Sequence, residues 1–157
     1  MKAVAAFVMI GLAALAGAAS AQQSASPTND IVATRKAAFA MSAVTVGAIA
    51  AGMESDAPLA SQGFTIGALK RWAHALPGAF PTGTSATDLP GATAAKPEIW
   101  TDRAGFEAKA ADYAAAVDKL GELAQANDVD GFEAQFAVVR ASCGSCHSVY
   151  RIERPRT

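Results

Sequence analysis

Residues 141–157 read ASCGSCHSVYRIERPRT, and residues 143–147 within them, CGSCH, contain both cysteines of the chain. Two thiols three positions apart close a loop too small for a disulfide to stabilise a fold, so this pair indicates chemistry. On a helix, Cys143, Cys146 and His147 occupy positions i, i+3 and i+4 and share one face. Two thiols and an imidazole are therefore expected to point at one patch of the interior.

The surrounding pattern predicts that this motif lies in a helix. The helix starts after Asn127 and Asp128, and Pro155 is expected to end it. Its apolar face recurs at helical spacing and consists of Phe132, Phe136, Val139, Cys143, Cys146 and Tyr150. The motif is thus placed deep in the last helix, with no βαβ pattern before it.

Three more amphipathic helices are predicted upstream: residues 26–53, residues 59–76 with Pro77 as the stop, and a helix that starts near Asp102. The inward stripe of the first is Ile31, Arg35, Ala38, Phe39, Ser42, Val46 and Ile49. Residues 77–101 form a loop rich in Gly, Pro, Thr and Ala, and loops of this length are usually functional or disordered. We expect an all-α fold, an antiparallel up-down-up-down four-helix bundle.

The composition agrees with this fold. Alanine is abundant, and only 7% of the 157 residues are aromatic, which favours closely packed helices. The chain has 13 Lys and Arg against 14 Asp and Glu, so it lacks the basic surplus of a nucleic-acid-binding protein.

Residues 1–21 have the layout of a secretory signal peptide: Lys2, an apolar run over residues 3–18, and a small-residue triplet at 19–21. The alternative is a transmembrane helix, but the run is shorter than the roughly 20 apolar residues that a bilayer requires. We expect cleavage after Ala21 and a soluble periplasmic protein, residues 22–157, that forms one domain.

The CGSCH motif predicts one covalently attached haem. C-x-x-C-H is the attachment signature of c-type haem, in which each thiol forms a thioether and the imidazole ligates the iron. A thiol–disulfide oxidoreductase places C-x-x-C at a helix N-terminus after a strand. A zinc site needs a fourth ligand, and the other histidine, His74, lies outside the apolar stripe of its helix and is expected at the surface.

Arg35 and Phe39 are predicted to face the iron from the opposite side, because the first helix begins at the end of the bundle where the fourth finishes. A buried guanidinium needs an anion, which a haem propionate can supply as a bidentate pair; otherwise Arg35 is a surface residue in a shifted register. Of the methionines, Met41 faces elsewhere, Met53 is far along the helix, and none follows His147. Phe39, which cannot ligate iron, is left as the distal residue.

The chain resembles the cytochrome c′ family. The matching stretches are TRKAAF (residues 34–39), KPEIW (96–100) and ASCGSCHSVYR (141–151). The resemblance implies thioethers at Cys143 and Cys146 and proximal ligation by His147. It also places Arg35 and Lys36 at the haem edge and propionates, although Lys36 replaces a frequent glutamine.

Further roles are implied by the same resemblance. Phe39 matches the distal position, where low-spin members carry a ligating methionine, so its presence implies a five-coordinate, high-spin haem. Arg151 matches a basic residue near the proximal face, or serves only as a cation at a helix C-terminus. Phe80, Pro97 and Trp100 are expected to wall the haem from the loop, Trp100 alternatively being a structural anchor.

The expected function is a monohaem cytochrome rather than an enzyme. An apolar distal pocket without a hydrogen-bond donor stabilises dioxygen poorly and admits small neutral diatomics. The resemblance implies binding of nitric oxide and carbon monoxide and one-electron transfer with an unidentified redox partner. It also implies a homodimer packed through the first two helices. The alternatives are a low-spin electron carrier with Met41 as sixth ligand and a weak peroxidase, which lacks a distal histidine or carboxylate.

Overall fold

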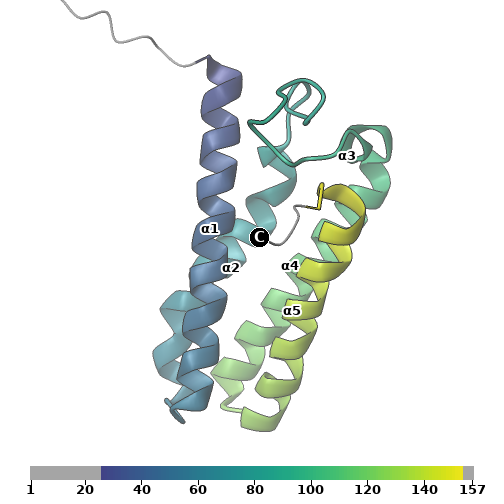
Figure 1. Ribbon diagram of the computed structural model, residues 1–157. Coiled ribbons are helices and arrows are strands. Elements are labelled where there is room, and N and C mark those ends of the chain that lie inside the picture. The colour runs from purple at the N-terminus through teal and green to yellow at the C-terminus, as the bar shows by residue number, and fades with distance from the viewer. Residues whose placement is uncertain (1–25, 154–157) are drawn as a thin grey trace, which may run out of the picture.

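The computed structural model describes residues 26–153, and their fold is a bundle of four long helices (Figure 1). The long helices are α1 (Pro27–Glu54), α2 (Gly63–Ala75), α4 (Arg103–Ala126) and α5 (Val129–Tyr150). Helix α1 packs on α2, α2 on α4 and α4 on α5, in the antiparallel up-down-up-down order that the sequence predicts. The proposed signal peptide and Pro155 lie outside the described residues.

Short polar residues start three of these helices. Ser26 caps α1 by accepting a hydrogen bond from the Asn29 amide, and Pro27 follows in the first turn. Asp102 and Asp128 cap α4 and α5 in the same way. Such side chains satisfy amide groups that the first turn leaves without partners.

The second helix differs from its predicted bounds of 59–76. A 3₁₀ turn, η1 (Leu59–Gln62), precedes α2, and a second one, η2 (Leu76–Ala79), follows it. Pro77 therefore lies inside a tight turn that continues from α2 and leads into the loop. A four-residue helix, α3 (Glu98–Thr101), precedes α4 and was not predicted.

The last helix ends earlier than predicted, at Tyr150 rather than near Pro155. Arg151 is extended and pairs with Ala95 in an isolated antiparallel β-bridge. The Lys96 amide donates to the Tyr150 carbonyl at 3.0 Å, and the Ile152 amide donates to the Ala94 carbonyl at 2.9 Å. The long loop thus binds the backbone directly after the haem motif.

The core lies mainly between α2, α4 and α5, with Ile49 contributed by α1 and Ile99 by α3. Its largest fully buried side chains are Ile49, Leu69, Ile99, Phe106, Val117, Leu120, Phe132 and Val139. In contrast, the 18-residue stretch of α1 that scores highest in hydropathy, with a mean of 1.5, is only 6% buried. By length and composition alone α1 is thus apolar enough to cross a membrane, a test that core helices and signal sequences also pass.

Candidate functional site

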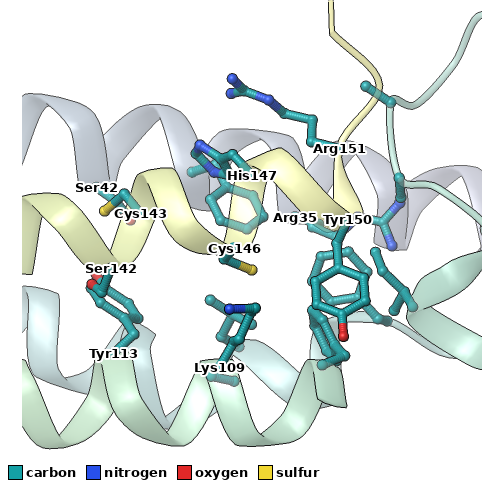
Figure 2. Close-up of a pocket in the computed structure, with 18 of the residues that line it drawn as sticks. Arg35, Ser42, Lys109, Tyr113, Ser142, Cys143, Cys146, His147, Tyr150 and Arg151 are labelled. Atoms are coloured by element: carbon teal, nitrogen blue, oxygen red, sulfur yellow. The ribbon is translucent and has the colours of Figure 1, made fainter. Parts of the chain in front are cut away.

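A cavity of about 780 Å³ lies between the long helices and the loop, within the range of small-molecule and cofactor sites. Figure 2 shows Cys143, Cys146 and His147 projecting from α5, with Arg35, Lys109 and Tyr113 around the same space. Side chains of α1 and α2, among them Phe39 and Trp72, complete its lining.

The three residues of the CGSCH motif share one face of α5 and line the cavity, as their spacing predicts. Neither cysteine is in a disulfide, and burial raises the pKa of both thiols. Burial, followed by the charge of Arg151, lowers the pKa of His147. A lowered pKa favours the neutral imidazole, which is the form that ligates metals.

Phe39 lies opposite His147, with 6.3 Å between the two ring centroids. It packs edge-on against Trp72, with centroids 5.0 Å apart, and also contacts the Phe80 ring. Met41 is 63% exposed, and neither it nor Met53 is among the residues lining the cavity. Aromatic carbon therefore faces the imidazole.

Arg35 is 3% exposed, so it is not a surface arginine. Its Nη1 donates to the Ala79 carbonyl at 3.2 Å and to Thr84 Oγ1 at 3.1 Å. Its Nη2 donates to the Thr84 carbonyl at 3.0 Å and to Thr93 Oγ1 at 2.9 Å. The guanidinium therefore binds the loop with both Nη groups, an arrangement that differs from the expected bidentate pairing with a carboxylate.

The loop wall is formed by Phe80 and residues 93–95. The Arg35 guanidinium lies 4.3 Å above the Phe80 ring centroid, a cation–π geometry. The expectation that Pro97 and Trp100 also wall the cavity is wrong, because neither lines it. Trp100 instead donates its indole N–H to the Pro81 carbonyl at 3.1 Å, which makes it an anchor of the loop.

The charges around the cavity have one sign. Among the described residues that line it, five are cationic and none is acidic. The cations are Arg35, Lys36, Lys109, Arg140 and Arg151. The Lys36 ammonium also donates to the Ala92 carbonyl at 3.2 Å. An apolar cavity with this rim suits a flat hydrophobic ligand that carries anionic groups.

The lining also includes residues that were not among the predicted site residues, among them Trp72, Thr93, Lys109 and Tyr113. Tyr113 belongs to the predicted apolar stripe of its helix, and burial raises the pKa of its hydroxyl. The helical register of Tyr113 is the sequence signal that placed it in the interior of the bundle. No periodic signal marks Thr93, because it belongs to the loop.

These residues fit a c-type haem. Two thiols that are not in a disulfide and a neutral imidazole project from one helix face into an apolar cavity, and cations at its rim can meet the two haem carboxylates. The fit rests on donor chemistry and on cavity size together.

The sequence is similar to known cytochromes. The cytochrome c′ family model matches residues 30–151. A cytochrome c′ of Rubrivivax gelatinosus is 34% identical over 127 residues, which cover 78% of this chain and 94% of the relative. A cytochrome c′ of Alcaligenes xylosoxydans xylosoxydans is 41% identical over 73 residues, 46% of this chain and 53% of that protein.

The fold is similar to solved structures of the same kind. A nitric oxide complex of a cytochrome c prime variant from Alcaligenes xylosoxidans superposes with a TM-score of 0.73 at 30% identity, covering 83% of this chain and all of that one. A carbon monoxide-bound variant from the same organism gives a TM-score of 0.72. The chain belongs to the cytochrome c′ family.

Proposed function

We propose that this protein is a periplasmic monohaem cytochrome whose haem iron is five-coordinate and high-spin, binds nitric oxide and carbon monoxide on its distal side, and can transfer one electron. The family binds haem c with iron, and the two cysteines of the chain fit covalent attachment. The observation that carries the proposal is the position of Phe39, which faces His147 where a low-spin cytochrome needs a ligand.

Cys143 and Cys146 would hold the group by thioethers, and His147 would ligate its iron. Lys36, Arg35 and Arg151 would lie at its carboxylates, and Phe80 would cover it from the loop. When bound, haem iron supplies an open coordination position for a diatomic gas and one exchangeable electron.

The surrounding side chains restrict what reaches that position. Phe39 and Trp72 pack edge-on with their ring centroids 5.0 Å apart, so apolar rings would border the position that a bound gas takes. Phe39 offers no hydrogen-bond donor to stabilise bound dioxygen. His147 is the one histidine among the described residues that line the cavity, and no carboxylate accompanies it, which argues against a peroxidase.

The nitric oxide and carbon monoxide complexes of the structural relatives support gas binding. Periplasmic location rests on the signal-peptide pattern of residues 1–21. A homodimer packed through α1 and α2 is supported by exposed apolar side chains on both helices: Met41 is 63%, Val44 65% and Phe64 85% exposed. Apolar side chains gathered on one surface mark interaction sites.

The ferric absorption and EPR spectra of the purified holoprotein test the spin state. A high-spin signal is expected. A low-spin spectrum with a methionine–iron charge-transfer band would replace the proposal by a six-coordinate electron carrier. Met41→Leu would then remove the band if Met41 were the ligand, whereas in the high-spin protein this variant leaves both spectra unchanged.

A further inference from the structure

The cavity has a positive rim that the described residues do not neutralise. Of its five cations, Lys36, Arg140 and Arg151 are exposed, and the ion pairs within residues 26–153 all involve other residues. The whole chain has 13 Lys and Arg against 14 Asp and Glu. The rim is therefore a local excess of positive charge on a molecule whose charges nearly balance.

A bound haem leaves part of this excess in place. Its two carboxylates can neutralise at most two of the five cations, so at least three positive charges remain. The proposed function places Lys36, Arg35 and Arg151 at the carboxylates. Arg140 stands eleven residues before Arg151, about 16 Å along the axis of α5. It is thus an exposed cation at the cavity that those carboxylates do not require.

Exposed apolar side chains accompany these cations. Ile152 lines the cavity and is 43% exposed, and Val149, in the last turn of α5, is 41% exposed. Figure 2 shows the side chain of Arg151, which lies between them in sequence, pointing away from Lys109 and Tyr113. Apolar side chains and arginines together, with a polar rim, are the mixture found where proteins dock.

The rim lies where a partner would come close to the haem. Lys36 belongs to α1 and Arg140 to α5, and the cavity is lined from both helices. Cys143, at which one thioether is proposed, follows Arg140 by less than one helical turn. One-electron transfer requires the two redox centres to approach each other. A protein that covers this rim approaches the haem edge rather than the far side of the bundle.

We propose that the rim formed by Lys36, Arg140 and Arg151 is the docking surface for the redox partner, and that this partner is a protein whose one-electron centre lies beside an acidic surface. The inference rests on the proposed haem position and one-electron transfer, but not on the coordination number of the iron. In the complex the reduced partner loses one electron and the ferric iron becomes ferrous, and no atom is transferred. Complementary charge acts chiefly on the association rate, and salt screens it.

The test reduces the ferric holoprotein with two probes of opposite charge: an acidic flavodoxin in its hydroquinone form and the methyl viologen radical cation. Stopped-flow mixing measures the second-order rate constant as the ionic strength is raised. Arg140→Gln removes one rim charge, and Arg140→Glu reverses it. Arg71→Gln and Arg71→Glu are the matched controls, because Arg71 is an exposed arginine of α2 that does not line the cavity.

The flavodoxin rate constant should fall as salt is added. At low salt it should drop about fivefold in Arg140→Glu and less in Arg140→Gln, since electrostatic steering raises association rates by roughly 10- to 1,000-fold in total. The methyl viologen rate constant should change in the opposite direction in each case. A shift in reduction potential would move both rate constants the same way, so opposite signs assign the effect to charge at the docking surface. The Arg71 variants should keep the wild-type values.

A flavodoxin rate constant that stayed level or rose with salt would overturn the proposal, as would equal losses in Arg71→Glu and Arg140→Glu. Losses with both probes in Arg140→Glu would do the same. If neither probe reduced the haem, one-electron transfer itself would be refuted and this inference with it. A low-spin EPR signal would refute the five-coordinate assignment without changing the salt dependence, so these failures can be told apart.

Discussion

Phe39 is the residue that the proposed function assigns to controlling access to the iron. Its ring is held between those of Trp72 and Phe80 while it faces His147. A side chain packed on two sides cannot rotate away without disturbing both neighbours. A gas molecule entering the distal side must displace Phe39 or find space beside it.

Phe39→Ala should therefore speed carbon monoxide binding to the ferrous protein by about tenfold, which corresponds to about 1.4 kcal/mol removed from the barrier. Flash photolysis or stopped-flow mixing measures the association rate. Phe64→Ala, which truncates a phenylalanine exposed on α2, is the control and should leave the rate unchanged. An unchanged rate in Phe39→Ala would show that Phe39 is not the gate.

Arg35 stabilises the loop as well as the site. Arg35→Met leaves the Ala79 and Thr84 carbonyls without this donor, and buried polar groups without partners cost about 1–3 kcal/mol each. The free energy of unfolding of the holoprotein, measured with denaturant, should fall by about 2–4 kcal/mol. Arg71→Met, at an exposed arginine of α2, should change it little. Equal losses in both variants would contradict this role.

Apart from Phe80, the predicted site residues that line the cavity lie on helices or directly after one, whereas Thr93 of the loop was not predicted. Cys143, Cys146 and His147 follow from spacing, and Arg35 and Phe39 from the apolar stripe of α1. Thr93 carries no such signal, because its place depends on the path of a loop that bonds to Arg35 and α5. The same loop supplies the neutral oxygens that bind Arg35 in place of the expected carboxylate.

At the scale of elements, one contact joins the start of α4 to the end of α5. Tyr150 donates its hydroxyl hydrogen to Asp102 Oδ2 at 2.6 Å, while Asp102 also caps α4. Burial, then this carboxylate, raises the pKa of Tyr150 to about 12. Gly105 leaves room for this hydrogen bond, because a Cβ at position 105 would collide with both the Asp102 carboxylate and the Tyr150 hydroxyl.

Tyr150→Phe should lower the free energy of unfolding by about 1.5–3 kcal/mol, the contribution typical of a hydrogen bond to a charged group. Gly105→Ala should displace the same bond, so the double variant should lose less than the sum of the two single losses. Denaturant titration of all three variants measures this coupling. Strict additivity would mean that Gly105 is not required for the Tyr150 contact.

Asp118 of α4 connects to α2 through Lys70 at 2.9 Å and through His74, the histidine expected at the surface and found there. The hydrogen bond from Lys70 is the main cause that lowers the pKa of Asp118 below 3.8. A carboxylate with a lowered folded pKa adds stability above its unfolded pKa, and this is lost as the pH falls through the folded value.

Asp118→Asn should consequently cost less than about 1 kcal/mol at pH 7, since the pair is partly exposed, and should cost nothing once the pH is well below 3.8. Unfolding curves of both proteins across that range measure the difference. A difference that persisted in acid would assign the effect to packing instead of charge.

The helix ends show which element boundaries the sequence pattern can predict. The starts of α4 and α5 were predicted closely, because Asp102 and Asp128 cap them. The end of α5 was misplaced, because pairing of Arg151 with Ala95 ends the helix before Pro155. Contacts between distant segments, rather than local propensity, set that boundary.

At the scale of the whole molecule, one helix stands apart. The other long helices bury many residues in a common core, whereas few residues of α1 are fully buried, and two of its large apolar side chains, Met41 and Val44, are exposed. Met41 and Val44 of α1 and Phe64 of α2 are the exposed apolar side chains described above. The proposed function assigns a second copy of the chain as the partner that covers these two helices.

Phe64→Asp should convert the dimer into monomers. The substitution removes about 1.5 kcal/mol of apolar burial from each of the two symmetry-related copies. The dissociation constant of the dimer should therefore rise roughly a hundredfold. Sedimentation equilibrium measures the change. Val138→Asp, on the outer face of α5 where Val138 is 51% exposed, is the matched control and should not affect assembly. A monomeric wild type, or a dimer that resists Phe64→Asp, would move the interface elsewhere.

The connection between α4 and α5 has a consequence for folding kinetics. Asn127 adopts a left-handed conformation with φ of 54°, and the two helices follow each other after only two residues. Contacts between neighbours in sequence close with little entropy loss and form early. The hairpin that carries CGSCH can therefore assemble before α1 packs against it, so the side of the pocket that carries the cysteines is built first and the side that carries Phe39 last.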